Sequence, residues 1–303
     1  MNRPTFLMLC GLPCSEKSTK AIELAIKYDA TIFSSDALRE ELFGDINCQT
    51  RNEELFRELH KRIKDCLKSG KSAIYDACNI HYKERKAFLA ELKRIPCEKI
   101  CIVMATPYEE CVRRAKVRER KVPEHVIKRM YRTFDPPWYY EGWDQIWIDY
   151  APNSSGACGW AVDWTESVMD YNQDNPHHTS TLGEHCENAK KWIINHEGSN
   201  SLKYAALLHD CGKPFVKTFV NSKGETTDIA HYYNHEHTGS YDSLFYIHTA
   251  YNLLVAVIIR WHMQPYFWEK DNNEKLHNKY RKLWGEGLYN DIMLLHEADK
   301  NAH

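Results

Sequence analysis

Short apolar runs alternate with segments of helical periodicity over the first half of the chain, and this alternation constrains the fold more than any other feature. The apolar runs cover residues 6–10, 30–34, 72–77, 99–105 and 145–150. Between most of them, apolar side chains recur with helical spacing, over residues 17–28, 53–67 and 82–92. Such alternation is typical of a parallel sheet covered by helices on both faces. We therefore expect an α/β domain with a parallel five-stranded sheet over residues 1–152.

The hydrophobic pattern changes after residue 150. Residues 151–159 are small, polar and rich in Gly and Ser, which indicates a loop or linker. From about residue 180 onward the apolar positions recur mostly at i, i+3 and i+4, without a comparable series of strand-like runs. At 303 residues the chain is about twice the length typical of one domain. We expect a second, all-α domain over residues 165–303.

Composition excludes several classes of protein. The 40 Lys and Arg against 42 Asp and Glu give a net charge of −2, which excludes binding of polyanions through overall charge but leaves room for a local basic patch. The hydrophobic fraction of 43% excludes a disordered chain. Eleven cysteines form no C-x-x-C pair and favour reduced thiols in the cytoplasm. The longest apolar stretch, residues 250–259, is shorter than the ~18 residues of a membrane span, so we expect a soluble cytoplasmic protein with no membrane contact.

The first apolar run leads into a loop of phosphate-binding type. Gly11, Lys17 and Ser18 fit the pattern G-x-x-x-x-G-K-[ST], except that Glu16 stands at the sixth position, where the pattern has glycine. In such loops backbone N–H groups and a helix N-terminus surround the phosphates, while the lysine and the hydroxyl serve phosphate and Mg²⁺. The pattern predicts ATP with Mg²⁺ as cofactor. The expected contacts are Gly11, Ser15, Lys17, Ser18 and Thr19.

Glu16 leaves two outcomes open for this loop. Like charges about 4 Å apart repel by about 4 kcal/mol at an effective dielectric constant near 20. That repulsion would cripple nucleotide binding if the glutamate side chain cannot turn away from the phosphates. The loop is therefore either a working ATP site or a degenerate one that is retained for binding.

A basic stretch follows the fourth apolar run. Residues 112–132 contain nine Lys and Arg against two Glu, an excess of +7 on a chain of net charge −2. Taken alone, such a stretch is more often a solvated helical face. After the fourth strand of a phosphate-loop domain, we favour an arginine-rich lid over the nucleotide.

Four segments in order give this half a family resemblance. They are the phosphate loop, SSDALREEL at 34–42, IYDACNI at 74–80 and the basic stretch that continues to FDPPWYYEGWDQI. Over about residues 5–150 the chain resembles the 5′-hydroxyl polynucleotide kinases of phage and bacterial RNA repair. The resemblance implies that Asp36 accepts the proton of the 5′-hydroxyl, that Arg39 holds the acceptor end, and that Arg114 and Arg118 clamp the donor phosphates. Cys14 and Glu16 depart from the family, which has glycines there.

Asp76 has two interpretations. It ends the third apolar run, and in parallel α/β sheets ligands bind at the carboxyl edge of the strands. A simple turn residue is the alternative. We expect Asp76 to belong to the nucleotide site.

Thirteen of the 16 histidines lie in the second half, and many of them fall in motifs. HTSTLGEH, AALLHDCGKP, HYYNHEH, IIRWHMQP and LLHEADKNA occur in that order between residues 178 and 302. Over about residues 170–303 the chain resembles HD-superfamily metal-dependent phosphohydrolases. The resemblance implies a first metal held by His185, His209, Asp210 and Asp299. His235 and His262 would hold a second metal, with Asp210 bridging the two.

Several details of this metal site stay open at the sequence level. His231 or His237 is an alternative to His235. His178 and Lys213 either contact the substrate phosphate or make structural hydrogen bonds. The mixture of imidazoles and carboxylates suits Mn²⁺, Fe, Ni²⁺ or Co²⁺, and two such ions can activate water and neutralise a phosphoester.

The two resemblances converge on one task. Cleavage of RNA through the 2′-hydroxyl leaves a 2′,3′-cyclic phosphate on one fragment and a 5′-hydroxyl on the other. We hypothesise an RNA end-healing enzyme that opens or removes the first end and phosphorylates the second, on tRNA fragments or other RNA, for a separate RNA ligase. The alternative is an HD nucleotide phosphohydrolase whose degenerate P-loop domain only binds RNA or nucleotide. The oligomeric state is left open by the sequence.

Overall fold

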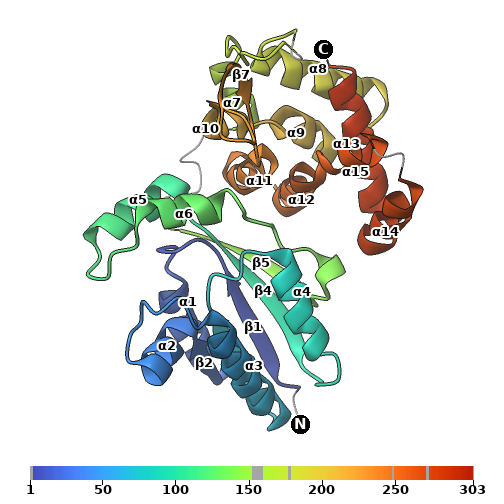
Figure 1. The fold of residues 1–303 in the computed structure, drawn as a ribbon. Helices are drawn as coiled ribbons and strands as arrows, with labels where there is room; N and C mark the ends of the chain where they lie inside the picture. Colours follow the sequence, from blue (N-terminus) through green and yellow to red (C-terminus); the bar gives the residue numbers. More distant parts are fainter. Residues whose placement is uncertain (1–2, 152–159, 177–178, 248, 271–272, 303) are drawn as a thin grey trace. The chain divides into compact units, whose positions relative to one another are not determined.

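Two compact units make up the chain. The computed structural model describes residues 3–151, 160–176, 179–247, 249–270 and 273–302 (Figure 1). Unit 1 comprises residues 1–128 and 137–151, and unit 2 comprises residues 129–136 and 152–303. The short segment 129–136 thus belongs to unit 2, although the last strand of unit 1 follows it in the sequence.

A five-stranded parallel sheet forms the centre of unit 1, as expected from the alternating pattern. Its strands lie in the order β2-β3-β1-β4-β5. They are β1 (Thr5–Cys10), β2 (Ala30–Ser34), β3 (Ser72–Asp76), β4 (Glu98–Ala105) and β5 (Gln145–Tyr150). Every residue of β1 is buried, because the strand has a neighbour on each side and helices on both faces. All strand carboxyl ends therefore meet at one edge, where the phosphate loop begins.

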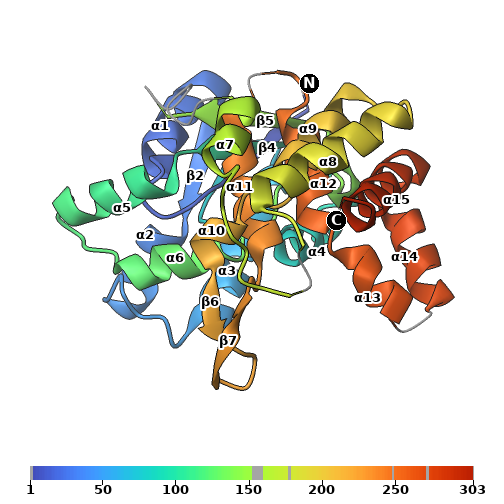
Figure 2. The same ribbon diagram turned by 90° about the horizontal axis from the view of Figure 1, so that it is seen from above.

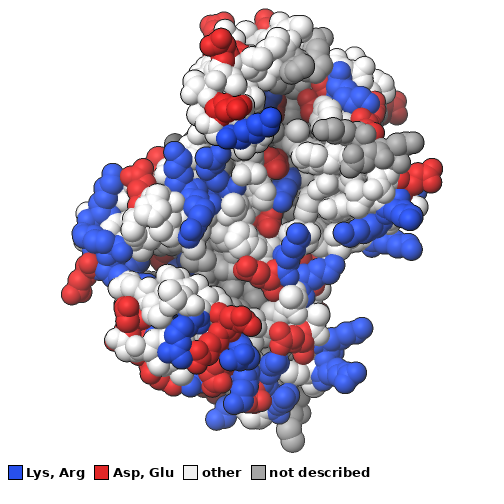
Figure 3. All heavy atoms as spheres, viewed as in Figure 1, with Lys and Arg blue, Asp and Glu red and all other residues white. Residues whose placement is uncertain are grey.

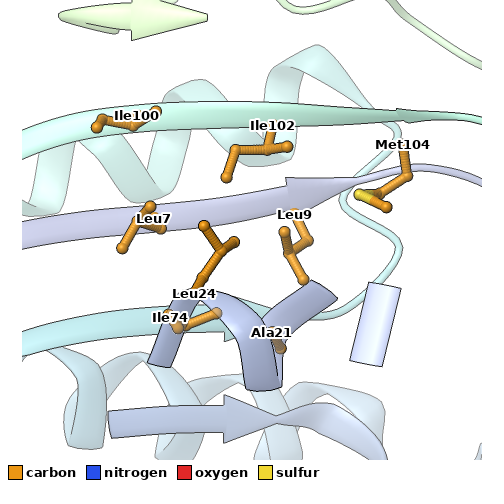
Figure 4. Close-up of a cluster of buried hydrophobic side chains, with 8 residues drawn as sticks. All are labelled: Leu7, Leu9, Ala21, Leu24, Ile74, Ile100, Ile102 and Met104. Carbon is orange, nitrogen blue, oxygen red and sulfur yellow. The ribbon is translucent and has the colours of Figure 1, made fainter. Parts of the chain in front are cut away.

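Helices cover both faces of this sheet (Figures 1 and 2). The first half of the chain contains α1 (Lys17–Tyr28), α2 (Ser35–Phe43), α3 (Asn52–Lys68), α4 (Tyr82–Glu91), α5 (Tyr108–Val117) and α6 (Glu124–Tyr131), with a 3₁₀ turn η1 (Tyr139–Glu141). Of these, α1, α2 and α3 pack on the strands, whereas α5 and α6 follow β4 in the chain. Leu7 and Leu9 of β1 pack against Ala21 and Leu24 of α1 (Figure 4). Phe6 points to the opposite face, where its ring lies 5.5 Å from that of Phe88 in α4. The strand's two-residue period thus fixes α1 on one face and α4 on the other.

Unit 2 is mostly helical. It contains α7 (Ala161–Ser167), α8 (Leu182–Asn195), α9 (Asn200–Leu208), α10 (Lys213–Val216), α11 (His235–Tyr246), α12 (Asn252–Trp261), α13 (Gln264–Lys270), α14 (Glu274–Trp284) and α15 (Glu286–Lys300). The buried apolar face of α12 and the amino end of α11 lie at its centre. None of the helices in the described part of the chain is long and apolar enough to cross a membrane.

The expectation of an all-α second domain is wrong over one stretch. Strands β6 (Thr218–Val220) and β7 (Thr226–His231) pair as an antiparallel hairpin. The physical reason is local, because this stretch is rich in β-branched residues and the intervening turn contains Gly224 at φ +84°. The hairpin joins α10 to the segment that leads into α11.

Candidate functional sites

The phosphate loop keeps the backbone shape of its glycine-containing pattern. It runs from the end of β1 to Lys17, where α1 begins. Cys14 and Glu16 both lie in the left-handed region, with φ angles of 65° and 68°. That region costs an ordinary L-residue roughly 1 kcal/mol and glycine almost nothing. The backbone at both positions therefore adopts a conformation that favours glycine, in spite of the two substitutions.

The groups expected to meet the phosphates and Mg²⁺ lie together at the carboxyl edge of the sheet. The Lys17 ammonium is buried and donates to the carbonyl oxygens of Gly11, at 3.1 Å, and Leu12, at 2.6 Å. It also lies 3.5 Å from the hydroxyl of the buried Ser15. The Ser18 hydroxyl donates to Oδ2 of Asp76 at 2.7 Å. A hydroxyl paired with a carboxylate is an oxygen donor set that suits a hard cation such as Mg²⁺.

Thr19 follows Ser18 in the first turn of α1 and is exposed. Asp76 is buried and ends β3, as its position in the third apolar run predicts. Its side chain is therefore more than a turn residue, since it reaches across to α1.

The Glu16 carboxylate is neutralised by the basic stretch. One of its oxygens lies 3.3 Å from the guanidinium of Arg114. The same guanidinium donates a hydrogen bond to Oε1 of Glu110 at 2.6 Å. Hydrogen bonds from Arg113 and Arg114 lower the pKa of Glu110 to about 2. Arg114 thus contacts two carboxylates, and its positive charge partly balances the negative charge of Glu16 beside the loop.

Arg118 and Arg120 extend this contact. The Arg118 guanidinium lies 3.5 Å from the sulfur of Cys14 in the loop. Arg120 donates to Oδ2 of Asp36, while Arg39 donates to Oδ1 of Asp36 at 3.0 Å. Asp36 lies in the first turn of α2, at the end of β2. Figure 3 shows lysines and arginines gathered over α5, in blue at the left.

Arg120 was missed by the sequence reasoning. Its signal was present, because it belongs to the same basic stretch and follows Arg118 by two residues. The sequence does not show that Arg120 contacts Asp36, because the two residues are 84 positions apart.

Four donor atoms converge in unit 2. Nε2 of His185 lies 3.1 Å from Nε2 of His209 and 3.0 Å from Oδ1 of Asp299. Oδ2 of Asp210 lies 3.5 Å from the first imidazole and 3.4 Å from the second. Donors about 2.1 Å from one ion lie about 3.0 Å apart at right angles and about 3.4 Å apart in a tetrahedron. Spacings of this size also occur between ligands of one metal ion. The donor cluster found among the described residues joins His185, His209 and Asp210, and Asp299 lies beside it, with Oδ1 at 3.0 and 3.5 Å from the two imidazoles.

A second set of donors shares Asp210. Its other oxygen, Oδ1, lies 3.2 Å from Nε2 of His235 and 4.0 Å from Nε2 of His262. The two imidazole nitrogens lie 3.2 Å apart. Because the two oxygens of Asp210 face different sets, this carboxylate is placed to bridge two ions.

The imidazole tautomers support a cation in the second set. Nδ1–H of His235 donates to the carbonyl of Tyr232 at 2.8 Å, and Nδ1–H of His262 donates to that of Ile259 at 2.6 Å. A carbonyl can only accept, so the proton of each neutral ring sits on Nδ1 and each Nε2 presents a lone pair. With both rings neutral, two lone pairs would face each other at 3.2 Å in a buried site, and either a metal cation or a proton held between the rings relieves that repulsion. The residues therefore fit a metal ion.

The charges of the site follow from burial and from these neighbours. Burial, together with His235 and His209, lowers the pKa of His262 to about 3. Burial opposes ionisation of His209 as well, but the carboxylates of Asp210 and Asp299 overcome it and raise its pKa to about 10. Burial also opposes ionisation of Asp210, yet Lys213 and His209 hold its pKa well below the usual range. The cluster thus keeps its carboxylates charged, as metal ligands require.

Other predicted residues have defined places. Lys213 is buried, and its ammonium lies 2.7 Å from Asp210 and donates to Oε1 of Gln173 at 2.8 Å. His231 pairs with Thr227 and stacks on Tyr233. His237 donates to the carbonyl of Phe134. The donor clusters found among the described residues contain neither His231 nor His237, whereas they contain His235. His178 and residues 152–159 of the expected linker lie outside the described residues.

Gln173 and Tyr266 were not found from the sequence. Gln173 accepts from Lys213, and the hydroxyl of Tyr266 donates to Oδ2 of Asp299 at 2.9 Å. Neither residue belongs to a metal-binding pattern, so only the folded chain shows that Gln173 contacts Lys213 and that Tyr266 contacts the predicted ligand Asp299.

The first half of the chain matches a known family. Residues 6–137 match the family model described as an AAA domain. The chain is 28% identical over 173 residues to the L-seryl-tRNA(Sec) kinase of Methanococcus maripaludis, which covers 55% of this chain. It spans 62% of the length of that curated relative. Unit 1 therefore contains a P-loop domain with kinase relatives.

Solved structures overlap part of the chain. A kinase structure from Chloroflexus aurantiacus has 19% identity and a TM-score of 0.43, over 50% of this chain and 86% of its own. The Pnkp1/Rnl/Hen1 RNA repair complex has 23% identity and a TM-score of 0.36, over 43% of each chain. A fungal RNA kinase has 12% identity and a TM-score of 0.37, over 49% of this chain and 38% of its own. Each overlap covers half of this chain or less.

Proposed function

We propose that this protein heals broken RNA ends with two activities. Unit 1 transfers the γ-phosphate of ATP to a 5′-hydroxyl, and unit 2 hydrolyses a 2′,3′-cyclic phosphate or 3′-phosphate with bound divalent metal ions. The observation that carries the proposal is the metal-ligand geometry of unit 2, in which one carboxylate bridges two sets of donors, next to a P-loop domain in the same chain. The products are the ends that a separate RNA ligase joins.

The kinase step needs an acid–base group and charge neutralisation. The 5′-oxygen attacks the γ-phosphorus, its bond to phosphorus forms as the β–γ bridging bond breaks, and ADP leaves. Asp36 takes the hydroxyl proton. Arg114 and Arg118, which contact the loop, neutralise the transferred phosphoryl group. The curated relative is named as a kinase of a tRNA-linked seryl group, which supports an acceptor hydroxyl carried on RNA.

The phosphoesterase step relies on the residues of the metal cluster. Bound metal ions would supply an activated water and neutralise the phosphoester. His185, His209, Asp210 and Asp299 would hold the first ion, and His235, His262 and Asp210 the second. Lys213, whose ammonium touches Asp210, keeps a positive charge at this carboxylate and orients it.

The kinase activity is tested by incubating 5′-hydroxyl RNA with γ-labelled ATP and Mg²⁺. Label on the RNA is expected from the unmodified protein, and Asp36→Asn should abolish it. Asp45→Asn is the matched control, since that carboxylate is exposed and accepts a hydrogen bond from the backbone N–H of Asn47 in its own turn. Absence of label with the unmodified protein would contradict the kinase half of the proposal.

The phosphoesterase activity is tested on a 2′,3′-cyclic-phosphate oligonucleotide with Mn²⁺, Ni²⁺ or Co²⁺ in turn. Conversion of the 3′ end is expected with at least one metal, and Asp210→Asn should remove it because this residue would serve both ions. His196→Gln, at an exposed histidine that stacks on Trp192, should leave the rate unchanged. Absence of conversion with all three metals would contradict the phosphoesterase half of the proposal. Parallel assays with 2′,3′-cyclic AMP and dNTPs separate RNA ends from free nucleotides as substrates.

One observation favours a second candidate function. Glu16 holds Arg114, and Arg120 holds Asp36, so two groups needed for phosphoryl transfer are engaged by charged neighbours. Unit 1 would then be a binding module for RNA or nucleotide attached to a metal-dependent phosphohydrolase. Nucleotide binding without any transfer of label would favour this candidate.

A further inference from the structure

A short segment from the first half of the sequence is built into unit 2. Residues 129–136, here called the strap, comprise the last residues of α6 and the segment that follows this helix toward β5. The Tyr131 ring lies edge-on to Phe215 at 4.8 Å and to Tyr241 at 5.6 Å. Phe134 is fully buried and also lies against Tyr241, at 4.8 Å. These aromatic contacts anchor the strap on α11.

The strap carries one buried carboxylate. Asp135 is only 6% exposed, and its Oδ1 accepts from Nε of Arg260 at 2.6 Å. The same oxygen lies 3.5 Å from Nδ1 of His237. That Nδ1–H donates to the carbonyl of Phe134 at 2.9 Å. The strap therefore holds Arg260 through a charge-assisted bond and His237 through its backbone and carboxylate together.

These two partners flank the expected ligands of the second metal. His237 follows His235 by two residues, at the amino end of α11. Arg260 precedes His262 by two residues, at the carboxyl end of α12. Asp135 thus connects the two helix ends whose ligand nitrogens must stay 3.2 Å apart.

We propose that Asp135 is a positioning residue that sets the spacing of His235 and His262 for the second metal ion. The inference rests on the proposed metal site of unit 2. An ion binds tightly only when its ligands are held near their final geometry, and outer partners of ligating histidines commonly alter metal affinity 10- to 100-fold. Asp135 acts one step further out, through the helix ends rather than through the ligands. The first ion would be held by residues of α8 and α15 and by the two residues that follow α9, and the strap's contacts with Arg260 and His237 involve none of these.

The charges around Asp135 explain why a carboxylate is required there. Arg260 stacks over Trp261 at 4.5 Å and carries the positive charge that Asp135 meets. Glu236 is the other acidic group, with its oxygens 3.8 Å from Nδ1 of His235 and 4.0 Å from Nε2 of His237. We expect the loss of the Asp135 charge to remove the 2.6 Å bond to Arg260, so that the ends of α11 and α12 are no longer joined through this carboxylate.

The test is a Mn²⁺ titration of the metal-free full-length protein, with free Mn²⁺ measured by electron paramagnetic resonance. The unmodified protein should bind two ions. Asp135→Asn keeps the size of the side chain and should weaken the second ion about tenfold, with the first unchanged. Asp174→Asn, at an exposed ion pair with Lys217, should leave both affinities unchanged.

A merely structural role is separated by a matched destabilised variant. Trp164→Phe alters a buried side chain on α7, a helix without expected ligands, and should lower the thermal midpoint without changing either Mn²⁺ affinity. Two ions bound by the unmodified protein, with equal affinities in Asp135→Asn or with both weakened alike, would overturn this inference alone. Fewer than two ions on the unmodified protein would instead overturn the proposed metal centre, and this inference with it.

Discussion

At the scale of single residues, Glu16 is where sequence and structure give different impressions. The sequence places a negative charge where phosphates should bind. The structure shows that charge 3.3 Å from Arg114 and its backbone in the left-handed conformation of the glycine that it replaces. Glu16 thus weakens the loop in two separable ways, by strain and by competing with phosphate for an arginine.

Replacing Glu16 tests both effects. Glu16→Gly should stabilise unit 1 by about 1 kcal/mol through relief of the left-handed strain, and should tighten ATP binding about tenfold because Arg114 is released. Glu16→Ala keeps the strain and removes the charge, so it should tighten ATP binding without the gain in stability. Calorimetric titration with ATP and urea denaturation measure the two quantities. Equal ATP affinity in all three proteins would contradict the role given to Arg114.

His60 provides a pH-dependent test in the same unit. Its ring stacks on Phe88 at 4.1 Å, and burial, aided by Lys64, lowers its pKa to about 4 despite the nearby Glu91. An unfolded histidine has a pKa near 6.5, so the folded state binds the proton less well. This contribution is complete above pH 6.5 and is lost as pH falls toward 4, by at most about 3 kcal/mol.

His60→Gln does not titrate in this range. Urea denaturation from pH 7 to pH 4 should therefore show the unmodified protein losing more stability than His60→Gln. His125→Gln, at an exposed histidine, should follow the unmodified protein. Parallel losses in all three proteins would show that the His60 ring is not buried in its neutral form.

At the scale of elements, an ion pair fastens α4 to the 3₁₀ turn η1. Arg85 and Glu141 are fully buried and joined by two hydrogen bonds of 2.8 and 2.6 Å. The indole of Trp143 donates to the same glutamate at 2.9 Å. The pair also places Arg85 against the carbonyl of Asn79, near the carboxyl end of β3. It therefore supports the edge of the sheet on which the nucleotide site lies.

Replacing one partner of this pair should lower the free energy of unfolding more than replacing both partners by apolar residues. Glu141→Gln leaves a buried guanidinium without its counter-charge, and should cost about 3–5 kcal/mol of unfolding free energy. The double variant Arg85→Met, Glu141→Leu should lose less, since no buried charge remains. Arg62→Met, at a surface pair with Glu41, should cost under about 1 kcal/mol. Urea denaturation measures all three, and a double variant worse than Glu141→Gln would refute the argument.

At the scale of the whole molecule, the near-neutral net charge averages two unlike units. Unit 1 carries the arginines that contact the phosphate loop, and unit 2 carries the buried histidine cluster. The two ligands proposed for this protein, ATP and a divalent metal ion, would therefore act on different cores. Each core should respond to its own ligand.

Calorimetry should show two unfolding transitions. Mn²⁺ at 100 times its dissociation constant should stabilise the transition of unit 2 by about 2.7 kcal/mol, and Mg²⁺–ATP at a similar excess should shift the other transition by a similar amount. Asp210→Asn should abolish the Mn²⁺ shift and leave the ATP shift in place. A single transition moved by both ligands would show that the units unfold together.

Much of this protein follows from local sequence. The five strands and the helical second half arise from periodicity, because burial on one or both faces of an element leaves its mark every two or 3.6 residues. The phosphate-loop and histidine motifs named many of the residues that meet in each cluster, but not Arg120, Gln173 or Tyr266. The β6–β7 hairpin was missed because β6 has only three residues and β7 is mostly exposed and polar, so neither strand contains an apolar run.

The tertiary structure decided what depends on residues far apart in the chain. It brought Arg114 to Glu16, Arg120 to Asp36, and the strap to the ends of α11 and α12. It also turned His235, rather than His231 or His237, toward Asp210. All three histidines have the same chemistry and similar spacing, so the sequence could not choose among them. Packing distinguishes them, because α11 begins at His235 and, of the three rings, only that of His235 lies in the buried donor cluster of the described residues.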